Sequence, residues 1–546
     1  MRLFLSIYLP LSLCANSFAY AQTTPPADLQ RIADAQPRNV IFILSDDHRY
    51  DFMGFTGKVP WLETPNMDRM AEEGAYFPNA FVTTSLCSPS RASILTGQFS
   101  HTHTVIDNQA PAPESLVFFP QYLQEVGYET GFFGKWHMGD DDDRPRPGFD
   151  HWESFRGQGD YYNPTLNING ERTAYSDSTY VTDLLTEHAL EWLEQRDEEK
   201  PFFMYLSHKA VHAMFEPAAR HLGKYQNEEI VLPPSFYTSA QPIKGKSNPY
   251  GQVDYAGAMA NAEQPINYPK NFLDQRAKQV DSVFKEPARH EAYYGENMTP
   301  DWQKTQRESW HGVDYMYHGE LDFETFYKRY CETLLGVDES VGAVLDYLDE
   351  QGLAESTLVI YMGDNGFSFG EHGLIDKRQF YEESVKVPFL VRYPEVLEGG
   401  QTIEKMVQNI DVAPTILELA GIQKPEQMQG RSLIPLLKDK EVDWRDRIFY
   451  EYYWEYAFPQ TPTMHGVRTD RYKYIRYHGV WDTNEFYDLQ ADPYEMNNLI
   501  GSPEHQDTIK QLLGELYTWM EQTGGMQIPL KRTMDEHFDH RNRGNY

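Results

Sequence analysis

The chain has 546 residues, of which 40% are hydrophobic and 24% are charged, and this fits a folded protein with one large and one smaller domain. Its formal net charge of −34 at pH 7 sets aside a nucleic-acid-binding protein, which would normally present a basic face. Any site for an anion must therefore be a local cluster of Lys, Arg, His or metal within an acidic surface.

The first 21 residues have the pattern of a signal peptide. Arg2 provides the positive start, residues 3–13 are mostly apolar, and residues 19–21 read Ala-Tyr-Ala, an A-x-A cleavage site. We therefore expect an exported protein, periplasmic or secreted, whose mature chain begins at Gln22. No later apolar run reaches the ~18 residues needed to cross a bilayer, so no membrane span is predicted.

The three cysteines lie in three different contexts. Cys14 belongs to the predicted signal peptide, and Leu13 before it disfavours a lipid anchor. Cys331 lies in a helical pattern and is expected to be a small buried residue. Exported proteins tend to pair their structural cysteines, but the surroundings of Cys87, described below, predict a chemical role instead.

Three apolar runs alternate with helical patterns. Residues 39–44, 202–206 and 357–362 are continuous apolar stretches that end in polar residues, which is typical of strands buried on both faces. Residues 182–195 and 326–353 carry apolar residues at helical spacing. This alternation predicts an α/β fold with a large, mostly parallel central sheet flanked by helices, and a site at the carboxyl ends of its strands.

The remaining sequence predicts an insertion and a smaller second domain. Residues 240–320 are polar and weakly periodic, which indicates a long insertion with short helices. Residues 447–454 and 472–477 alternate like half-exposed strands, and residues 507–523 have a helical pattern. The predicted divisions are the signal peptide (1–21), a main domain with the insertion (22–440), and a C-terminal subdomain with an antiparallel sheet, a helix and a tail (441–546).

Polar side chains that follow two of the predicted strands form a set of oxygen ligands. Asp46 and Asp47 follow the first strand, and Asp364 and Asn365 follow the strand at 357–362. Two adjacent carboxylates repel each other unless they are neutralised, although such a pair alone is as often a helix cap or a turn. An all-oxygen set favours Ca²⁺ or Mg²⁺ over zinc.

Cys87 begins the most specific stretch of the sequence. Residues 87–97 read Cys-Ser-Pro-Ser-Arg-Ala-Ser-Ile-Leu-Thr-Gly, and a Cys before Ser-Pro is by itself an ordinary loop leading to a helix. The stretch resembles the whole signature of the sulfatase family, in which C-x-P-S-R continues as A-S-I-L-T-G. The resemblance implies an alkaline-phosphatase-like fold. It also implies oxidation of Cys87 to formylglycine (3-oxoalanine) by a dedicated maturation enzyme, with the formylglycine hydrate as nucleophile.

Further segments resemble the same family. Residues 134–139 match its G-K-W-H-x-G motif, and residues 207–212 resemble the segment that ends in a catalytic His, although Val211 stands where Pro is common. Residues 373–388 resemble the lysine segment of carbohydrate sulfatases. The first metal strand, the second metal segment and the C-terminal subdomain are matched by residues 39–47, 363–366 and 487–499.

The resemblance assigns a metal site and a nucleophile. One calcium ion would be held by Asp46, Asp47, Asp364, Asn365 and the oxygen of the modified Cys87. The cation would lower the cost of a deprotonated hydrate beside an anionic substrate. Arg91 would hold the hydrate in place and offset its charge.

The resemblance also assigns groups for sulfate binding and proton transfer. Lys135 and Lys377 would grip sulfate oxygens, where negative charge gathers as sulfur is attacked. His212 would protonate the leaving alcohol, which matters because a sugar alkoxide leaves poorly. His137 would then take a proton from the modified Cys87 so that sulfate is expelled. A single Lys or His is usually structural or solvated, but several separate segments present the right residue here.

Three more residues are candidates for substrate contact. His103 and Asn108 resemble positions that line the sugar pocket of glucosamine-sulfatase-like members, and His372 stands beside the second metal segment. A structural role is as well supported for each of them.

The leading functional hypothesis is hydrolysis of sulfate esters on a carbohydrate, with an algal polysaccharide such as ulvan placed ahead of animal glycosaminoglycans. The alternatives are a phosphodiester or phosphonate monoester hydrolase of the same superfamily, a sulfatase of small aryl or alkyl esters, and a non-catalytic glycan-binding relative. The filled nucleophile, metal and cation positions argue against the last. The residues predict neither an oligomeric state nor which hydroxyl carries the sulfate.

Overall fold

The computed structural model describes residues 29–139, 142–235 and 323–529, apart from residues 34, 456–457 and 479–482. It also describes residues 300, 302–303, 306 and 312. The predicted signal peptide, most of the predicted insertion at 240–320 and the tail from residue 530 lie outside the described residues.

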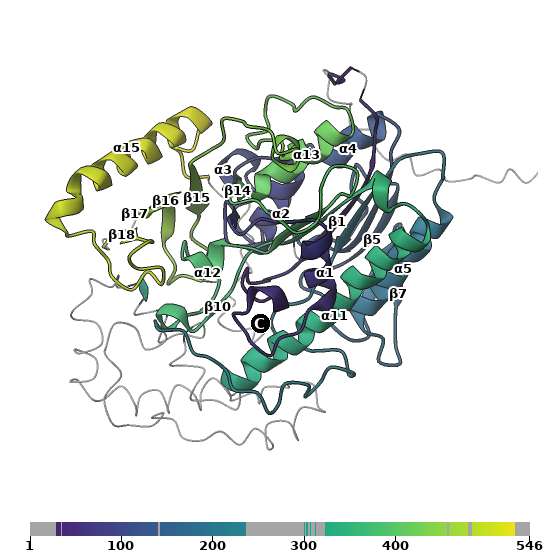
Figure 1. Cartoon of the computed structure of the whole chain (residues 1–546), viewed down its shortest axis with the longest axis horizontal. Coiled ribbons are helices and arrows are strands. Elements are labelled where there is room, and N and C mark those ends of the chain that lie inside the picture. The colour runs from purple at the N-terminus through teal and green to yellow at the C-terminus, as the bar shows by residue number, and fades with distance from the viewer. Residues whose placement is uncertain are drawn as a thin grey trace, which may run out of the picture.

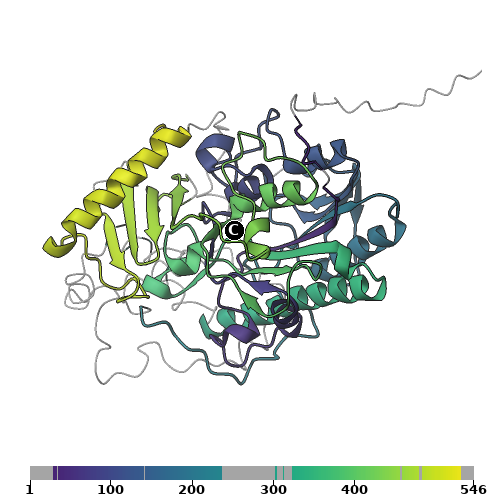
Figure 2. The ribbon, with the colours of Figure 1, turned by 45° about the horizontal axis from the view of Figure 1, so that its top comes forward.

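A ten-stranded sheet runs through the larger part of the molecule (Figure 1, Figure 2). Its five central strands are parallel, in the order β9 (Thr357–Gly363), β1 (Asn39–Ser45), β8 (Phe202–Ser207), β4 (Glu129–Lys135) and β5 (His151–Phe155). One edge continues with β12 (Phe389–Arg392), β2 (Ala75–Tyr76) and β13 (Gln401–Thr402), and the other with β6 (Thr165–Ile168) and β7 (Glu171–Ala174).

Helices cover both faces of this sheet, which explains why residues 40–44 of β1 are all apolar. Side chains of a strand alternate between faces, and those of β1 enter two separate cores. Phe42 packs in the core that contains residues of α2 (Cys87–Thr96), α4 (Phe119–Glu125) and α13 (Val412–Leu419). Ile41 packs in the core beneath α1 (Pro65–Glu73), α5 (Val181–Gln195) and α11 (Phe323–Glu350).

The C-terminal residues form a second, smaller sheet beside the main one (Figure 1). Its antiparallel strands are, in order, β15 (Arg447–Tyr452), β16 (Thr463–Thr469), β17 (Tyr472–His478) and β18 (Glu485–Asp488). Helix α15 (Gln506–Thr523) covers this sheet, and Trp519 stacks on Phe449 with ring centroids 4.8 Å apart. The predicted fold class, a mostly parallel sheet between helices plus a small antiparallel sheet and helix, is confirmed.

Strand β15 also forms hydrogen bonds with the segment that leads into α2. The backbone N–H of Glu451 donates to the carbonyl of Thr83 at 3.0 Å, and the Thr84 hydroxyl donates to the carbonyl of Glu451. The Glu451 carboxylate accepts from the imidazole of His101, just beyond α2, at 2.7 Å. The small sheet therefore holds both ends of the segment that carries Cys87.

The smaller elements connect these layers. They are β3 (Ala80–Phe81), β10 (Ser368–Phe369), β11 (Ile375–Asp376), β14 (Val407–Gln408), α3 (Ser100–His103), α12 (Glu382–Val385), α14 (Ile434–Leu437) and five 3₁₀ turns (Gly54–Thr56, Ala354–Ser356, Glu371–Gly373, Asn409–Asp411, Pro503–His505). No helix in the described part of the chain is both long and apolar enough to cross a membrane.

His208, which follows β8, gives a testable pH dependence of stability. It is fully buried, its Nε2 lies 3.0 Å from the Ser340 hydroxyl, and burial, aided by Arg91, lowers its pKa from 6.5 to about 3. Because the pKa of His208 is lower in the folded state than in the unfolded chain, its neutral imidazole is fully compatible with the fold above pH 6.5. The free energy of unfolding then decreases as the pH falls from 6.5 toward 3. Between pH 7 and 5 the wild type should lose about 2 kcal/mol relative to His208→Gln.

Urea unfolding of both proteins at the two pH values checks this prediction. A stability difference that does not change with pH would mean that His208 titrates normally in the fold.

Candidate active site

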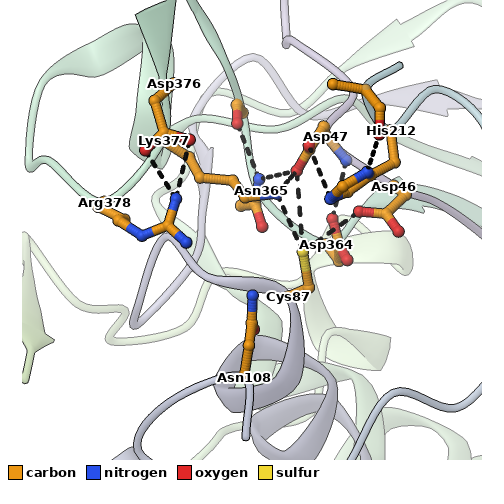
Figure 3. Close-up of polar contacts among 12 residues, drawn as sticks. Asp46, Asp47, Cys87, Asn108, His212, Asp364, Asn365, Asp376, Lys377 and Arg378 are labelled. Atoms are coloured by element: carbon orange, nitrogen blue, oxygen red, sulfur yellow. Dashed lines mark hydrogen bonds and ion pairs between the residues drawn. The ribbon is translucent and has the colours of Figure 1, made fainter. Parts of the chain in front are cut away.

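The carboxyl ends of β1 and β9 bring four predicted ligand residues together (Figure 3). The two strands pair in parallel with Ser45 opposite Gly363, so the residues that follow them meet. The backbone N–H of Asp47 donates to Asp364 Oδ1 at 3.0 Å, and Asn365 Nδ2 donates to Asp47 Oδ1 at 2.7 Å. All four side chains, including Asp46, are buried.

Cys87 completes this group from the first turn of α2. Its Sγ lies 3.3 Å from Asp46 Oδ1 and 3.9 Å from Asp47 Oδ1 (Figure 3). One ligand atom from each of Asp46, Asp47, Cys87 and Asp364 lies within 4.8 Å of all the others. Burial and the nearby Asp46 raise the pKa of the Cys87 thiol, so the unmodified residue is a neutral thiol. We call these four residues and Asn365 the Cys87 cluster.

Arg91 links the nucleophile helix to the carboxylates. It lies one turn after Cys87 on α2, and its Nε donates to Asp364 Oδ2 at 2.9 Å. Its Nη2 lies 3.4 Å from Asp46 Oδ2, and its Nη1 donates to the carbonyl of Lys135 and the hydroxyl of Ser207. The guanidinium therefore links α2 to the carboxyl ends of four strands, β1, β4, β8 and β9.

Lys135 and Lys377 approach the cluster from separate segments. The Lys135 ammonium bonds the Asp46 carboxylate, and the Lys377 ammonium bonds Asp47 and lies 3.0 Å from Cys87 Sγ. Burial opposes ionisation of Asp46, but the charges of Lys135 and its neighbours lower its pKa overall. Both ammonium groups are buried beside the predicted nucleophile.

Gly134 determines how Lys135 reaches the cluster. Its φ is +111°, and a Cβ on it would lie 1.9 Å from the carbonyl oxygen of Ser207 in β8. Only glycine allows the two strands to approach this closely with that backbone conformation.

The two candidate acid–base histidines follow different strands, His137 after β4 and His212 after β8. His212 Nε2 is 3.9 Å from Asp47 Oδ2, and its Nδ1 lies 2.5 Å from the carbonyl of Ala213. A carbonyl can only accept, so the Nδ1 carries the proton and the Nε2 faces the cluster. Burial and the charges of Lys377 and Lys135 lower the pKa of His212. His137 has a left-handed backbone (φ 55°), and the Ser88 hydroxyl donates to its carbonyl.

Gln158 contacts both Lys135 and His137. Its Oε1 accepts from Lys135 Nζ at 2.6 Å, and its Nε2 lies 3.2 Å from His137 Nε2. Gln158 lies in a loop without a recognisable motif, so the sequence alone did not predict it.

The Arg378 guanidinium, beside Lys377, is a further group to which the sequence alone assigned no role. It bonds Asp376 at 2.7 and 2.8 Å and Glu455 at 2.8 Å. Glu455 follows β15, so the C-terminal sheet contributes a buried carboxylate next to the lysine segment.

The structure does not place His103 or His372 in contact with the Cys87 cluster. His103 Nε2 lies 3.0 Å from the hydroxyl of Ser93 on α2, and its Nδ1 accepts from the N–H of Val105 at 3.1 Å. The ring of His372 stacks on Tyr381 with centroids 4.0 Å apart. Asn108 lies closer to the nucleophile helix, since its Oδ1 accepts from the Ser88 N–H at 3.1 Å. Substrate contact by His103 or His372 stays a prediction.

The Cys87 cluster has the properties of a site for a hard divalent cation. Asn365 Oδ1 is buried and has no hydrogen-bond partner among the described residues. Burial raises the pKa of Asp47 and Asp364, the latter to about 7, and repulsion from Asp46 adds to both shifts. Three crowded carboxylates and an orphaned amide oxygen are the donor set that calcium prefers.

Comparison with known families places this geometry in context. Residues 38–422 match the family model described as "Sulfatase". Residues 370–522 match the one described as "N-sulphoglucosamine sulphohydrolase, C-terminal".

Individual relatives are similar over most of the chain. An N-acetylglucosamine-6-O-sulfatase of Bacteroides thetaiotaomicron is 35% identical over 488 residues, covering 87% of this chain and 85% of the relative. An ulvan-active sulfatase of Formosa agariphila is 26% identical, covering 89% and 81%. A solved structure of a protein in complex with its substrate D-glucosamine-2-N,6-O-disulfate is 33% identical with a TM-score of 0.73, covering 91% of this chain and all of the other.

Proposed function

The chain belongs to the sulfatase family, and from this premise we propose that it hydrolyses a 6-O-sulfate ester on a glucosamine-type sugar. The observation that carries the proposal is the Cys87 cluster with an ammonium group on either side. The sugar is proposed from two relatives, the N-acetylglucosamine-6-O-sulfatase and the protein solved with a glucosamine disulfate. The ulvan-active relative is less similar, so ulvan is the second substrate to test.

The proposed enzyme depends on a modified residue and a metal ion. Cys87 is converted to formylglycine by a maturation enzyme, and its hydrate supplies the attacking oxygen where Sγ now lies. Calcium, held by Asp46, Asp47, Asp364 and Asn365, would stabilise negative charge on that oxygen. Arg91 holds the same region from α2 through Asp364 and Asp46.

Lys135 and Lys377 bind the sulfate in the proposed mechanism. Their ammonium groups bond Asp46 and Asp47, which would turn toward the metal when it is bound and leave both cations for the ester. Negative charge on the sulfate oxygens increases as sulfur is attacked, so fixed cations stabilise the transition state more than the substrate.

His212 donates the proton that a sugar leaving group requires. Lys377 and Lys135 are among the causes that lower its pKa. A sulfate anion between these lysines offsets their charges, so the imidazole gains its proton at Nε2 when the substrate is present. After bond cleavage, His137 accepts a proton from residue 87 so that sulfate is released and the aldehyde re-forms.

Gln158 is a positioning residue for this chemistry, because it contacts both Lys135 and His137. We expect Gln158→Ala to lower kcat about tenfold, since a charged hydrogen bond is lost at a group that binds the transition state. Gln158→Glu should fail to restore the rate, because a second carboxylate would compete for Lys135. Steady-state kinetics with one substrate checks both variants, and an unchanged kcat for Gln158→Ala would remove it from the mechanism.

Ion chromatography of sulfate released from defined oligosaccharides tests the proposed function. The enzyme is coexpressed with a formylglycine-generating enzyme, and conversion of Cys87 is confirmed by peptide mass. Release from N-acetylglucosamine-6-O-sulfate is expected, with ulvan oligosaccharides as the second substrate. If no sulfate is released from any sugar although Cys87 is converted, small sulfate esters and phosphonate monoesters become the substrates to examine.

A further inference from the structure

Lys209 is a buried cation that the mechanism above does not use. It lies in the segment between Ser207, which binds Arg91, and His212. Only 5% of its surface is exposed, and no hydrogen bond or ion pair reaches its ammonium from any residue that the structure describes. The side chain is buried as a whole, but its Nζ is still reached by solvent, so an anionic ligand could approach this unpaired ammonium.

The ammonium of Lys209 lies close to residues of the candidate active site. Its Nζ is 4.6 Å from the centre of the Tyr161 ring, and the Tyr161 hydroxyl donates to the carbonyl of His212 at 2.7 Å. Burial lowers the pKa of Lys209 to about 8, and Lys135 adds to this effect while Asp46 opposes it. The charges of Lys135 and Asp46, two residues of the candidate active site, therefore influence the pKa of the Lys209 ammonium.

The catalytic charges are already matched without Lys209. Each carboxylate of the Cys87 cluster contacts its own cation: Asp46 with Lys135, Asp47 with Lys377, and Asp364 with Arg91. In the proposed mechanism the metal takes over the carboxylates, and Lys135 and Lys377 then bind the ester sulfate. Glu216 and Asp160 also raise the pKa of Lys209, yet neither forms an ion pair with it. The positive charge of Lys209 therefore has no ion-pair partner among the described residues, and it lies close to the proposed substrate site.

We propose that Lys209 binds a second anionic group of the substrate, a sulfate or carboxylate other than the ester that is hydrolysed. This inference rests on the proposed function and predicts a preference, among 6-O-sulfated glucosamine sugars, for those that carry a second anionic group. The protein solved with D-glucosamine-2-N,6-O-disulfate has a substrate of this kind.

The test compares two substrates in the wild type and in Lys209→Met, which keeps the length of the side chain but removes its charge. The substrates are N-acetylglucosamine-6-O-sulfate and glucosamine-2-N,6-O-disulfate. The ratio of kcat/KM for the disulfate to that for the monosulfate should fall roughly 10- to 100-fold, the loss of one charged hydrogen bond. Lys209→Arg should keep most of the preference, because it restores the charge.

A matched control and a stability measurement separate binding from structure. Lys424 is a partly buried lysine whose ammonium donates to the carbonyl of Met428 at 2.7 Å, and Lys424→Met should leave the ratio unchanged. The Tm of Lys209→Met should equal or exceed that of the wild type, since the charge that is removed forms no hydrogen bond or ion pair with a described residue. A lower Tm with an unchanged ratio would mean that Lys209 is structural, and would overturn the proposal.

Calorimetry with Cys87→Ala protein and the same two ligands repeats the comparison without turnover. If neither ligand binds and matured wild type releases no sulfate, the proposed function fails. If both ligands bind and Lys209→Met leaves their affinity ratio unchanged, only the role of Lys209 is refuted.

Discussion

Cys87→Ala should abolish sulfate release, with kcat reduced by roughly 10⁴-fold or more. The thiol lies where the two metal segments and both lysines converge, and the Cys87 cluster contains no other thiol or hydroxyl among the described residues. Removing the attacking group also removes the division of one hard hydrolysis into two easier steps. Sulfate release by matched amounts of variant and matured wild type measures the effect.

Cys331→Ala is the matched control for this substitution. Cys331 is equally buried, but it packs in the core beneath α11 and not in the site. We expect full activity and a loss of about 1 kcal/mol of stability from the small cavity. If Cys87→Ala retained activity, Cys87 would not be the nucleophile, whatever the substrate.

Removal of calcium with EGTA should lower activity to below about 1% and lower the Tm by roughly 5 °C. Burial, together with repulsion from Asp46, raises the pKa of Asp47 and Asp364, so without a cation their ionised forms are unfavourable in this site. Added Ca²⁺ should restore both properties. The measurements are thermal unfolding and sulfate release with and without chelator.

Two variants decide whether the Cys87 cluster is responsible for the calcium effect. The Asp364→Asn variant should be inactive, and its Tm should not change when calcium is added or removed. Asp346→Asn is the control, because Asp346 is an exposed carboxylate on α11 that pairs with Arg69. A wild type whose Tm and activity are unaffected by EGTA would contradict the calcium assignment.

The parts of the fold that the sequence predicted are those governed by local pattern. β1, β8 and β9 are apolar on both faces because helices cover both sides, and this gives an uninterrupted run in the sequence. β4 was missed as a strand because Gly131 and Gly134 interrupt its apolar pattern, although close packing against neighbouring elements requires glycine at both positions.

The site was predictable where a residue follows a strand or lies in a family motif. Asp46, Asp47, Asp364 and Cys87 were predicted together, and the structure brings them within contact. Gln158 and Glu455 could not be predicted, because each enters the site from a loop whose path depends on tertiary packing. The acidic composition likewise gave no indication of how densely cations are concentrated around Cys87.

The hydrogen bonds between β15 and the segment before α2 affect when Cys87 becomes enclosed during synthesis of the chain. Thr83 and Thr84 are held by Glu451, which leaves the ribosome long after Cys87. Until residue 451 emerges, the nucleophile segment lacks that restraint, whereas in the finished fold Cys87 is fully enclosed. If Cys87 is converted to formylglycine as proposed, the maturation enzyme would therefore act before residue 451 is in place, and fast folding would compete with it for the same molecules.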